Sequence, residues 1–289
     1  LGTGLKSNVR GLFASAIDLV NRSETKVFSV DIPSGVDGSS GRICGLAVQS
    51  DVTVTFDHAK IGHGTQPGAA CAGLLEVADI GIPQAMRPEI ESDVVLVDAS
   101  DAANWLPDRS EVGHKGRFGH LLLLSGSPGK TGAAALAGNA AVRGGCGLVT
   151  AAVPAAVHDI LEIKLTEAMT CPLADENGFV GSAALPQLKT LLNDRQALAV
   201  GPGLGVSDGL RQLLGELLVG TELPLVVDAD GLNLLAGQLD VLKQRDGGPV
   251  ILTPHPGEMS RLCGLSVVDI EADRYRVARN FAIEYGVIL

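Results

Sequence analysis

The feature of this sequence that most constrains its fold is the alternation of short apolar segments with helical segments. Five apolar runs of strand length occur in the second half, at residues 120–124, 148–153, 197–200, 223–227 and 250–252. Segments of helical character, such as the alanine-rich residues 131–143, lie between them. Strands that alternate with helices through short connections predict a parallel sheet covered by helices, so we expect an α/β fold.

The first part of the chain carries a similar pattern. Residues 8–21 have apolar positions at helical spacing, which predicts a helix with one buried face. Residues 26–32, 52–56 and 73–78 are predicted to form strands. We therefore expect a separate α/β unit here, also built on a parallel sheet.

Residues 84–113 interrupt both patterns. They contain Pro88, Pro107 and seven acidic residues, with one apolar run at residues 94–97. This composition is typical of a linker. We predict two domains, residues 1–83 and residues 114–289, joined by an extended linker that includes a short strand at 94–97. In the second domain we expect three layers, with helices on both faces of the sheet.

Charge and cysteine spacing restrict the partners of the chain. The formal net charge of −11 argues against nucleic acid and against an anionic membrane surface. No apolar run reaches about 18 residues, so no transmembrane helix is predicted. The five cysteines form no CxxC pair, which favours separate reduced thiols over a zinc site or a disulfide framework. These features are typical of a cytoplasmic protein.

Candidate functional residues cluster where strands of the predicted sheets end. In an open parallel sheet, ligands bind beyond the carboxyl ends of the strands. Four groups of polar or glycine residues occupy such positions, at residues 31–35, 201–205, 228–233 and 255–258. Their coincidence with strand ends indicates an enzyme.

Two glycine-rich loops join a strand to a helix. Residues 201–205 read Gly-Pro-Gly-Leu-Gly, and their free N–H groups and the following helix N-terminus favour an anionic ligand. The alternative is a tight strand-to-helix turn. In residues 125–132, Gly129-Lys130-Thr131 is similar to a P-loop, but no glycine stands five residues earlier, so we reject that interpretation.

Acidic side chains and one histidine at the later strand ends allow two interpretations each. His255 and Glu258 flank a Pro-Gly turn, where they would bind a ribose or orient a hydroxyl, or merely start a helix. Asp228 and Asp230 would bind a metal or exchange protons. For Asp230 we favour a structural role, capping a helix at residues 232–236.

Asp31 and Ser34 close the first strand of the chain. A carboxylate and a hydroxyl three residues apart on a turn suit cation coordination or proton abstraction. An Asx or Ser turn without chemistry is comparably consistent with this single motif.

Taken together, these strings resemble one family. Residues 1–5, 30–36 and 53–56, with Lys60 and Gly62, are similar to the NAD(P)H-hydrate epimerase domain. The strings similar to the ADP/ATP-dependent NAD(P)H-hydrate dehydratase domain are residues 114–116 with Gly119, 132–134, 143–145 with 147–149, 201–205, 228–230 with 232–235, and 253–258. The chain therefore resembles the bifunctional NAD(P)H-hydrate repair enzymes over nearly its whole length, except residues 84–113.

The resemblance implies a fold and an activity. It implies a partial Rossmann-like epimerase domain and a partial ribokinase-like domain of three layers. The family interconverts the R and S hydrates of NADH and NADPH. It then dehydrates the S form after ADP or ATP phosphorylates the ring hydroxyl. The resemblance also implies potassium and magnesium as cofactors, hydrated NADH or NADPH and a nucleotide as small-molecule partners, and a homo-oligomer in the cytoplasm.

The resemblance also implies roles for particular residues. Asp31 matches the proton-transfer carboxylate, which also binds the hydrate, and Ser34 matches a potassium ligand. The remaining substrate-binding positions are Gly2, Thr3, Gly4, Leu5, Lys6, Ser7 and Asn8 in the first domain, and Ala133, Gly205, His255, Pro256, Gly257, Glu258, Met259, Ser260 and Arg261 in the second.

The sequence departs from the family pattern at its ends. The family's epimerase begins before Leu1, and its dehydratase continues past Leu289 with a Lys-Gly-rich nucleotide loop and a Gly-Gly-x-Gly-Asp segment. We therefore expect a chain truncated at both ends, and we expect the chain as given to lack full dehydratase activity. Two other functions stay open: a small-molecule kinase of the ribokinase-like group, and a non-catalytic binding protein.

Overall fold

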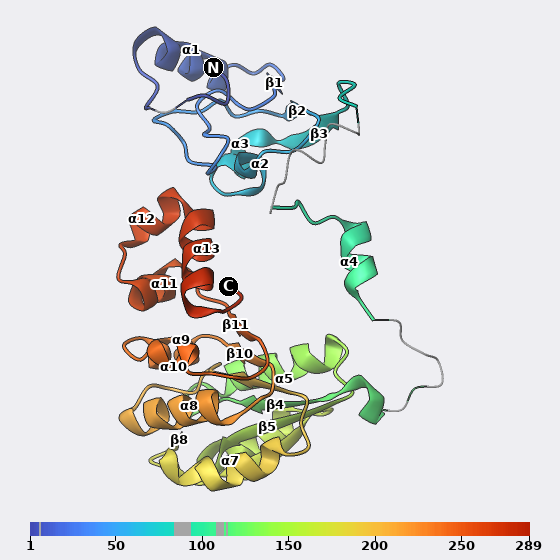
Figure 1. The fold of residues 1–289 in the computed structure, drawn as a ribbon, viewed down its shortest axis with the longest axis vertical. Coiled ribbons are helices and arrows are strands. Elements are labelled where there is room, and N and C mark those ends of the chain that lie inside the picture. The colour runs from blue at the N-terminus through green and yellow to red at the C-terminus, as the bar shows by residue number, and fades with distance from the viewer. Residues whose placement is uncertain (6, 84–93, 108–112, 114) are drawn as a thin grey trace. The chain divides into compact units, whose positions relative to one another are not determined.

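The computed structural model describes residues 1–5, 7–83, 94–107, 113 and 115–289. The chain divides into two compact units, one of residues 1–108 and 271–277 and the other of residues 109–270 and 278–289. The boundary predicted within residues 84–113 falls partly outside the described residues and stays a prediction. Figure 1 shows the elements of both units, each of which is described by itself below.

The first unit contains a parallel sheet of three strands. Its strands are β1 (Phe28–Val30), β2 (Val52–Phe56) and β3 (Leu74–Ala78), and they lie in the order β1-β2-β3. Its helices are α1 (Gly11–Asn21), α2 (Ile61–Gly64) and α3 (Gly68–Ala72). The predicted strand at 52–56 has these bounds, and the strand predicted at 26–32 is shorter.

Helix α1 differs from its prediction in how it is covered. Ile17 is its one buried residue, whereas Leu12, Phe13 and Leu19 are 83%, 61% and 72% exposed. The predicted buried face is therefore wrong for the described residues. The apolar residues of α1 do follow helical spacing, but the described part of this unit covers the helix mainly at Ile17, so most of the apolar face is exposed.

The segment after residue 93 also differs from its prediction. Residues 94–97 form no strand, and α4 (Ala99–Trp105) follows instead of extended linker. Asp98 begins this helix, because its Oδ1 accepts from Ser100 N at 2.7 Å and from Asp101 N at 3.0 Å. An aspartate N-cap followed by an acidic residue three positions later is a helix start signal that the linker interpretation overlooked.

The second unit is built on a parallel sheet of six strands in the order β11-β10-β9-β4-β5-β6. The strands are β4 (His120–Leu124), β5 (Leu148–Pro154), β6 (Met169–Leu173), β9 (Ala197–Val200), β10 (Leu225–Val227) and β11 (Val250–Leu252). Every neighbouring pair is parallel. This confirms the parallel sheet. The edge strand β6 was not predicted, and the short antiparallel hairpin of β7 (Asp175–Glu176) and β8 (Phe179–Val180) lies outside the sheet.

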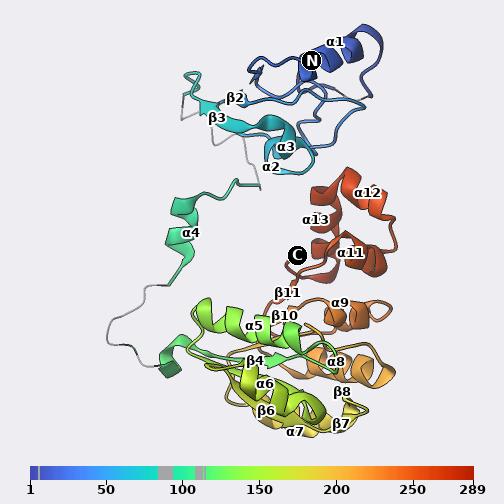
Figure 2. The ribbon, with the colours of Figure 1, turned by 180° about the vertical axis from the view of Figure 1, so that it is seen from behind.

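Helices cover both faces of this sheet, which confirms the three-layer prediction. Figure 1 shows α8 in front of the sheet, and Figure 2, seen from behind, shows α5 and α6 over the other face. The helices of this unit are α5 (Thr131–Arg143), α6 (His158–Lys164), α7 (Leu185–Leu192), α8 (Asp208–Gly220), α9 (Asp230–Leu235), α10 (Asp240–Lys243) and α11 (Pro256–Cys263). Two further helices, α12 (Val267–Ala272) and α13 (Arg274–Tyr285), include residues 271–277, which belong to the first unit.

Apolar side chains on the inner faces of these layers form the core. On one side, Leu123 and Val149 from the sheet pack with Ala134 of α5 and Leu161 of α6. On the other side, α8 buries leucines at positions three and four residues apart: Leu210, Leu213, Leu214, Leu217 and Leu218. This spacing gives α8 an apolar stripe that faces the sheet.

From the sequence alone we predict one helix over residues 269–284, but the structure has two, α12 and α13. Asp273 lies between them, and its Oδ1 accepts a hydrogen bond from Arg276 N at 3.2 Å. This is an N-terminal capping contact, so the side chain of Asp273 starts a new helix inside the predicted one. None of the helices in the described part of the chain combines the length and apolarity that crossing a membrane requires.

Gly201, directly after β9, lies where β9 and β10 end side by side. Its φ is +127°, and a Cβ atom there would stand 1.8 Å from Asp228 O. Its N–H donates to Leu124 O at 3.1 Å, so the loop is also tied to β4. Only glycine fits this position, because any side chain would collide with the neighbouring backbone.

We expect Gly201→Ala to destabilise the chain by about 2 kcal/mol or more, because the backbone around Gly201 must move to admit a methyl group. Gly220→Ala, at the end of α8, is the matched control, since nothing lies within 4 Å of its added Cβ. That control is expected to change stability by less than about 1 kcal/mol. Urea unfolding curves measure both variants, and equal midpoints for the two would contradict the prediction.

Candidate functional site

The first candidate site lies at the carboxyl ends of β1 and β2. Asp31 follows β1 directly and adopts a φ of +67°. Its Oδ1 accepts from Lys60 Nζ at 2.5 Å and from Thr55 Oγ1 at 3.0 Å. A non-glycine residue with positive φ is uncommon, and such strain is retained where the surroundings fix the residue.

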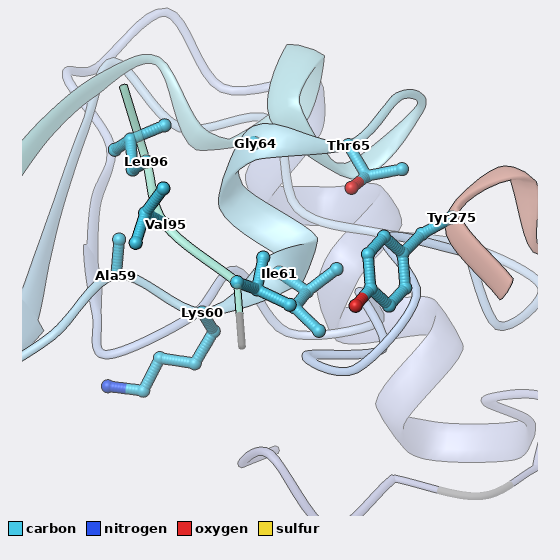
Figure 3. A pocket seen from close by; sticks show the side chains of 9 residues that line it. Ala59, Lys60, Ile61, Gly64, Thr65, Val95, Leu96 and Tyr275 are labelled. Carbon is cyan, nitrogen blue, oxygen red and sulfur yellow. The ribbon is translucent and has the colours of Figure 1, made fainter. Parts of the chain in front are cut away.

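Lys60 is anchored by more than Asp31. Its Nζ also donates to Thr55 Oγ1 at 2.8 Å and to Phe56 O at 3.2 Å. Its backbone N–H donates to Nδ1 of His63 at 3.0 Å, which fixes the start of α2. Figure 3 shows Lys60 beside Ile61, with the lysine side chain extending away from α2. The ammonium group is therefore held in one place rather than free on the surface.

The charges of this site follow from its contacts. Burial raises the pKa of Asp31, but the hydrogen bonds from Lys60, Thr55 and the Phe56 N–H, with the charge of Lys60, hold that pKa below its ordinary value. Burial lowers the pKa of His63, so its ring stays neutral at pH 7. Asp31 is consequently an ionised carboxylate, able to accept a proton, and Lys60 supplies the opposite charge.

The predicted hydrate-binding loop lies beside the turn that follows Asp31. The backbone nitrogen of Leu1 lies 2.9 Å from Ser34 Oγ, and Thr3 Cγ2 lies 3.5 Å from the position a Cβ atom would take at Gly38. Leu1, Gly2, Gly4 and Leu5 line a shallow depression of about 230 Å³. Ser7 and Asn8 continue the loop, and Lys6 lies outside the described residues.

The second candidate site lies where β4 and β9 end, at the same edge of the six-stranded sheet. The two glycine-rich loops that follow these strands are bonded to each other. Gly126 N donates to Pro202 O at 3.0 Å, and Ser127 Oγ donates to Gly203 O at 2.8 Å. A Cβ on Gly203 would stand 2.7 Å from Lys130 O, so the loops are in close backbone contact.

Asp230 joins these two loops. Its Oδ2 accepts from Lys130 Nζ at 2.8 Å and from Gly205 N at 2.9 Å. Burial raises the pKa of Asp230, but the bonds from Lys130 and Gly205 hold it below the ordinary value. The predicted helix-capping role of Asp230 is wrong: α9 starts at Asp230 itself, and its N-cap, Ala229, makes no side-chain capping bond. The carboxylate instead accepts hydrogen bonds from Lys130 and Gly205, because the two loops that carry them lie within hydrogen-bonding distance.

Contacts at the ends of β10 and β11 hold the other predicted residues. Thr253 Oγ1 donates to Asp228 Oδ1 at 2.8 Å, which links the two strand ends. His255 is the N-cap of α11, and its Nδ1 accepts from Gly257 N at 3.0 Å. Glu258 completes a reciprocal capping pair, because its Oε2 accepts a hydrogen bond from His255 N at 3.0 Å. The helix-start interpretation is therefore what these contacts show, and the functional role of His255 stays a prediction.

The rest of α11 divides between core and loop contacts. Met259 is buried, Ser260 Oγ donates to Leu265 O at 2.6 Å, and Arg261 Nη1 donates to Asn233 Oδ1 at 2.9 Å. Pro256 and Gly257 form the first turn of the helix. Arg261 is the member of this group that contacts α9, the helix that follows β10.

Gly205, Ala133 and His255 are substrate-binding positions implied by the resemblance, and because all three lie at or just past strand ends we predict that they line one pocket. They follow β9, β4 and β11, and because all these strands are parallel the three residues lie at the same edge of the sheet. Gly205 also contacts the hairpin, since a Cβ there would stand 2.6 Å from Phe179 Cε1. A single pocket shared by all three stays a prediction.

Comparison with known proteins identifies the family. A family model described as NAD(P)H-hydrate dehydratase matches residues 121–289. The chain belongs to this family. A second model, described as YjeF-related protein N-terminus, matches residues 1–62. The family resemblance drawn from the sequence motifs is thereby confirmed.

Individual relatives agree with the NAD(P)H-hydrate dehydratase assignment. The bifunctional NAD(P)H-hydrate repair enzyme Nnr of Moorella thermoacetica is 44% identical over 289 residues, which are 100% of this chain and 54% of that protein. The ADP/ATP-dependent NAD(P)H-hydrate dehydratase from Bacillus subtilis, co-crystallised with ATP/Mg²⁺, has 30% identity and a TM-score of 0.55, covering 65% of this chain and 62% of that one. The chain thus spans about half the length of the curated relative.

The ribokinase-like fold is confirmed as well. A ribokinase-like superfamily protein from Enterococcus faecalis matches with a TM-score of 0.50 and 22% identity, covering 62% of this chain and 59% of that one. At this identity the match concerns the fold alone.

Three residues with site contacts were not among the predicted site residues. Lys60 was noticed only as part of a motif, Lys130 stood in a loop that we rejected as a P-loop, and Asp230 was interpreted as a cap. The available signal was their position: each lies in a segment that follows a strand of a parallel sheet.

We expect Lys60→Met to raise the pKa of Asp31, because it removes the cation and hydrogen bond that lower it. Because the pKa of Asp31 is lower in the folded than in the unfolded chain, its ionisation stabilises the fold at pH values above the ordinary aspartate pKa. This stabilisation is lost as the pH falls through the lowered pKa of the folded state. Carboxyl-carbon NMR titration measures the shift. Lys26→Met, which removes the exposed partner of Asp51, is the control and should leave Asp31 unchanged. An unchanged Asp31 pKa in Lys60→Met would count against the charge assignment.

Proposed function

We propose that this chain is part of a bifunctional enzyme that repairs hydrated NADH and NADPH. Its first domain, residues 1–83, would epimerise the R and S hydrates. Its second domain, residues 114–289, would dehydrate the S hydrate at the expense of ADP or ATP, and residues 84–113 would link the two. The observation that carries the proposal is the pairing, in one chain, of the Asp31–Lys60 site with the two-loop edge of a ribokinase-like sheet.

Epimerisation requires a proton to leave and return to the hydrate, and Asp31 is suited to that task. The carboxylate is ionised, because Lys60 and Thr55 stabilise its charged form. It lies beside the turn that carries Ser34 and next to the loop of residues 1–5. We propose that Asp31 accepts and returns the proton, and that residues 2–8 bind the phosphates of the hydrate.

Dehydration in this proposal proceeds through a phosphate ester. The ring hydroxyl loses its proton and accepts a phosphoryl group from the nucleotide. The phosphate then leaves and the neighbouring ring carbon loses a proton, so that the dihydropyridine double bond forms. Phosphorylation converts a poor leaving group into a good one. Gly205, Ala133 and the 255–261 segment would position the hydrate, since all of them lie at the edge of the sheet where ligands bind in this architecture.

The ions and setting of the reaction are part of the same proposal. Ser34 offers a hydroxyl oxygen, a ligand type that suits potassium, although the described residues contain no group of three or more acidic, histidine or cysteine side chains placed for a metal. Ser34 does not complete a coordination shell, so no step above depends on potassium. Magnesium would accompany the nucleotide. We propose a homo-oligomer that acts in the cytoplasm on small molecules.

We expect Asp31→Asn to slow epimerisation by about 10²-fold or more, because general acid–base groups contribute about that much. The complete protein that contains this chain is supplied with R-hydrate and ATP, with a separate dehydratase in excess. Recovery of the reduced nicotinamide absorbance then reports epimerisation. Asp51→Asn is the matched control, an exposed carboxylate in the same unit that also pairs with a lysine, and it should not slow the reaction.

The dehydratase half of the proposal is tested with the same protein. S-hydrate and ADP or ATP should give back reduced nicotinamide, with nucleotide consumed one for one. Consumption of nucleotide by a simple alcohol but not by the hydrate would point to a small-molecule kinase instead. Equal rates of epimerisation by Asp31→Asn and wild type would show that Asp31 is not the proton-transfer residue.

A further inference from the structure

Two charged residues at the second site have no role in the mechanism above. Lys130 opens α5, and Asp230 opens α9, one hundred residues further along the chain. A single carboxylate oxygen of Asp230 accepts both the Lys130 ammonium, at 2.8 Å, and the Gly205 amide, at 2.9 Å. The lysine is therefore fixed beside the glycine that the family resemblance makes a hydrate-binding position.

The two partners of this ion pair differ in exposure. The Asp230 side chain is 18% exposed, whereas that of Lys130 is 49% exposed. The carboxylate is therefore the more enclosed partner, and about half of the lysine side chain is open to solvent. Within the described residues, Asp230 is the acceptor that the Lys130 ammonium contacts, so further N–H donors are available to a ligand.

The surroundings of Lys130 favour an anion. The first turn of α5 carries no acidic residue and no side-chain cap. A second lysine, Lys164, donates from its Nζ to Thr131 Oγ1 at 2.9 Å, also at the first turn of α5. An added Cβ at Gly129 or Gly132 would meet nothing within 4 Å, so the loop is open to an approaching ligand.

We propose that Lys130 binds a phosphate oxygen of a substrate, and that Asp230 is the positioning residue that holds Lys130 beside the turn at Gly205. Lysine is a compact point charge suited to phosphate, and a lysine that is already held loses less freedom on binding. Both the hydrate and the nucleotide carry phosphates, so either supplies the required chemistry. The inference rests on the proposed function, because that function brings a phosphate-bearing ligand to this edge.

The test compares variants of the complete protein in steady-state dehydration of S-hydrate. Lys130→Met should raise the KM for the phosphate-bearing substrate that Lys130 binds by about 10-fold or more, since a hydrogen bond to a charged group contributes about that much. Lys130→Arg keeps the cation and should retain most of the affinity. A higher KM for the hydrate alone or for the nucleotide alone identifies which phosphate is bound.

Asp230→Ala should raise the same KM as Lys130→Met, and it should also speed hydrogen exchange of the Gly205 amide, whose acceptor it removes. The control is Lys243→Met, which removes a similarly exposed, ion-paired lysine of the same unit, whose partner is Glu284. That control should change neither KM nor exchange at Gly205. A purely structural role would lower the melting temperature without changing KM.

The outcome for wild type separates this inference from the proposed function. If wild type does not convert S-hydrate, the proposed function fails, and calorimetric titration of ADP and of NADH into wild type and Lys130→Met then tests the inference directly. Weaker binding of either compound by Lys130→Met supports the inference. Unchanged KM values, or unchanged binding of both compounds where wild type is inactive, overturn it.

Discussion

The parallel pairing of strands is the constraint on which both candidate sites depend. In a parallel sheet every strand points the same way, so the loops that follow the strands meet at one edge. The registers of β4 with β9, β9 with β10 and β10 with β11 are set by backbone hydrogen bonds between buried apolar segments. These bonds bring residues such as Lys130, Gly205 and Asp230 together, although long stretches of sequence separate them. The chemistry of the edge is therefore a product of sheet assembly.

Both units use the same arrangement at such an edge. In each, an aspartate just beyond a strand pairs with a lysine from another segment, Asp31 with Lys60 and Asp230 with Lys130. The lysine lowers the pKa of its partner even though partial burial acts in the opposite direction. The difference lies in what surrounds each pair. In the first pair the aspartate also accepts a hydrogen bond from the hydroxyl of Thr55, whereas in the second it accepts one from the backbone amide of Gly205 in a glycine-rich loop.

The sequence was sufficient for the elements whose patterns are local. The strand at 52–56, the helix at 131–143 and the strand at 250–252 have the predicted bounds, because apolar period and flanking turn residues decide them. Asp230 could not be assigned in this way. Whether an aspartate caps its own helix or accepts from a lysine depends on which loop folds back to it, and that is set by tertiary contacts. The same holds for α1, whose apolar period says nothing about what covers it.

The bonds that join the two glycine-rich loops also determine when the edge can form. Ser127 contacts Gly203 across 76 positions of sequence, and Lys130 contacts Asp230 across 100. Contacts of this range must overcome the entropy of loop closure, so chains that depend on them fold more slowly than chains held by local contacts. During synthesis the chain must have emerged as far as Gly203 before the two loops can bond to each other, and as far as Asp230 before Lys130 meets its partner. Until β9 has emerged, the edge of β4 that pairs with it lacks its neighbour, and an unpaired strand edge of this kind favours aggregation.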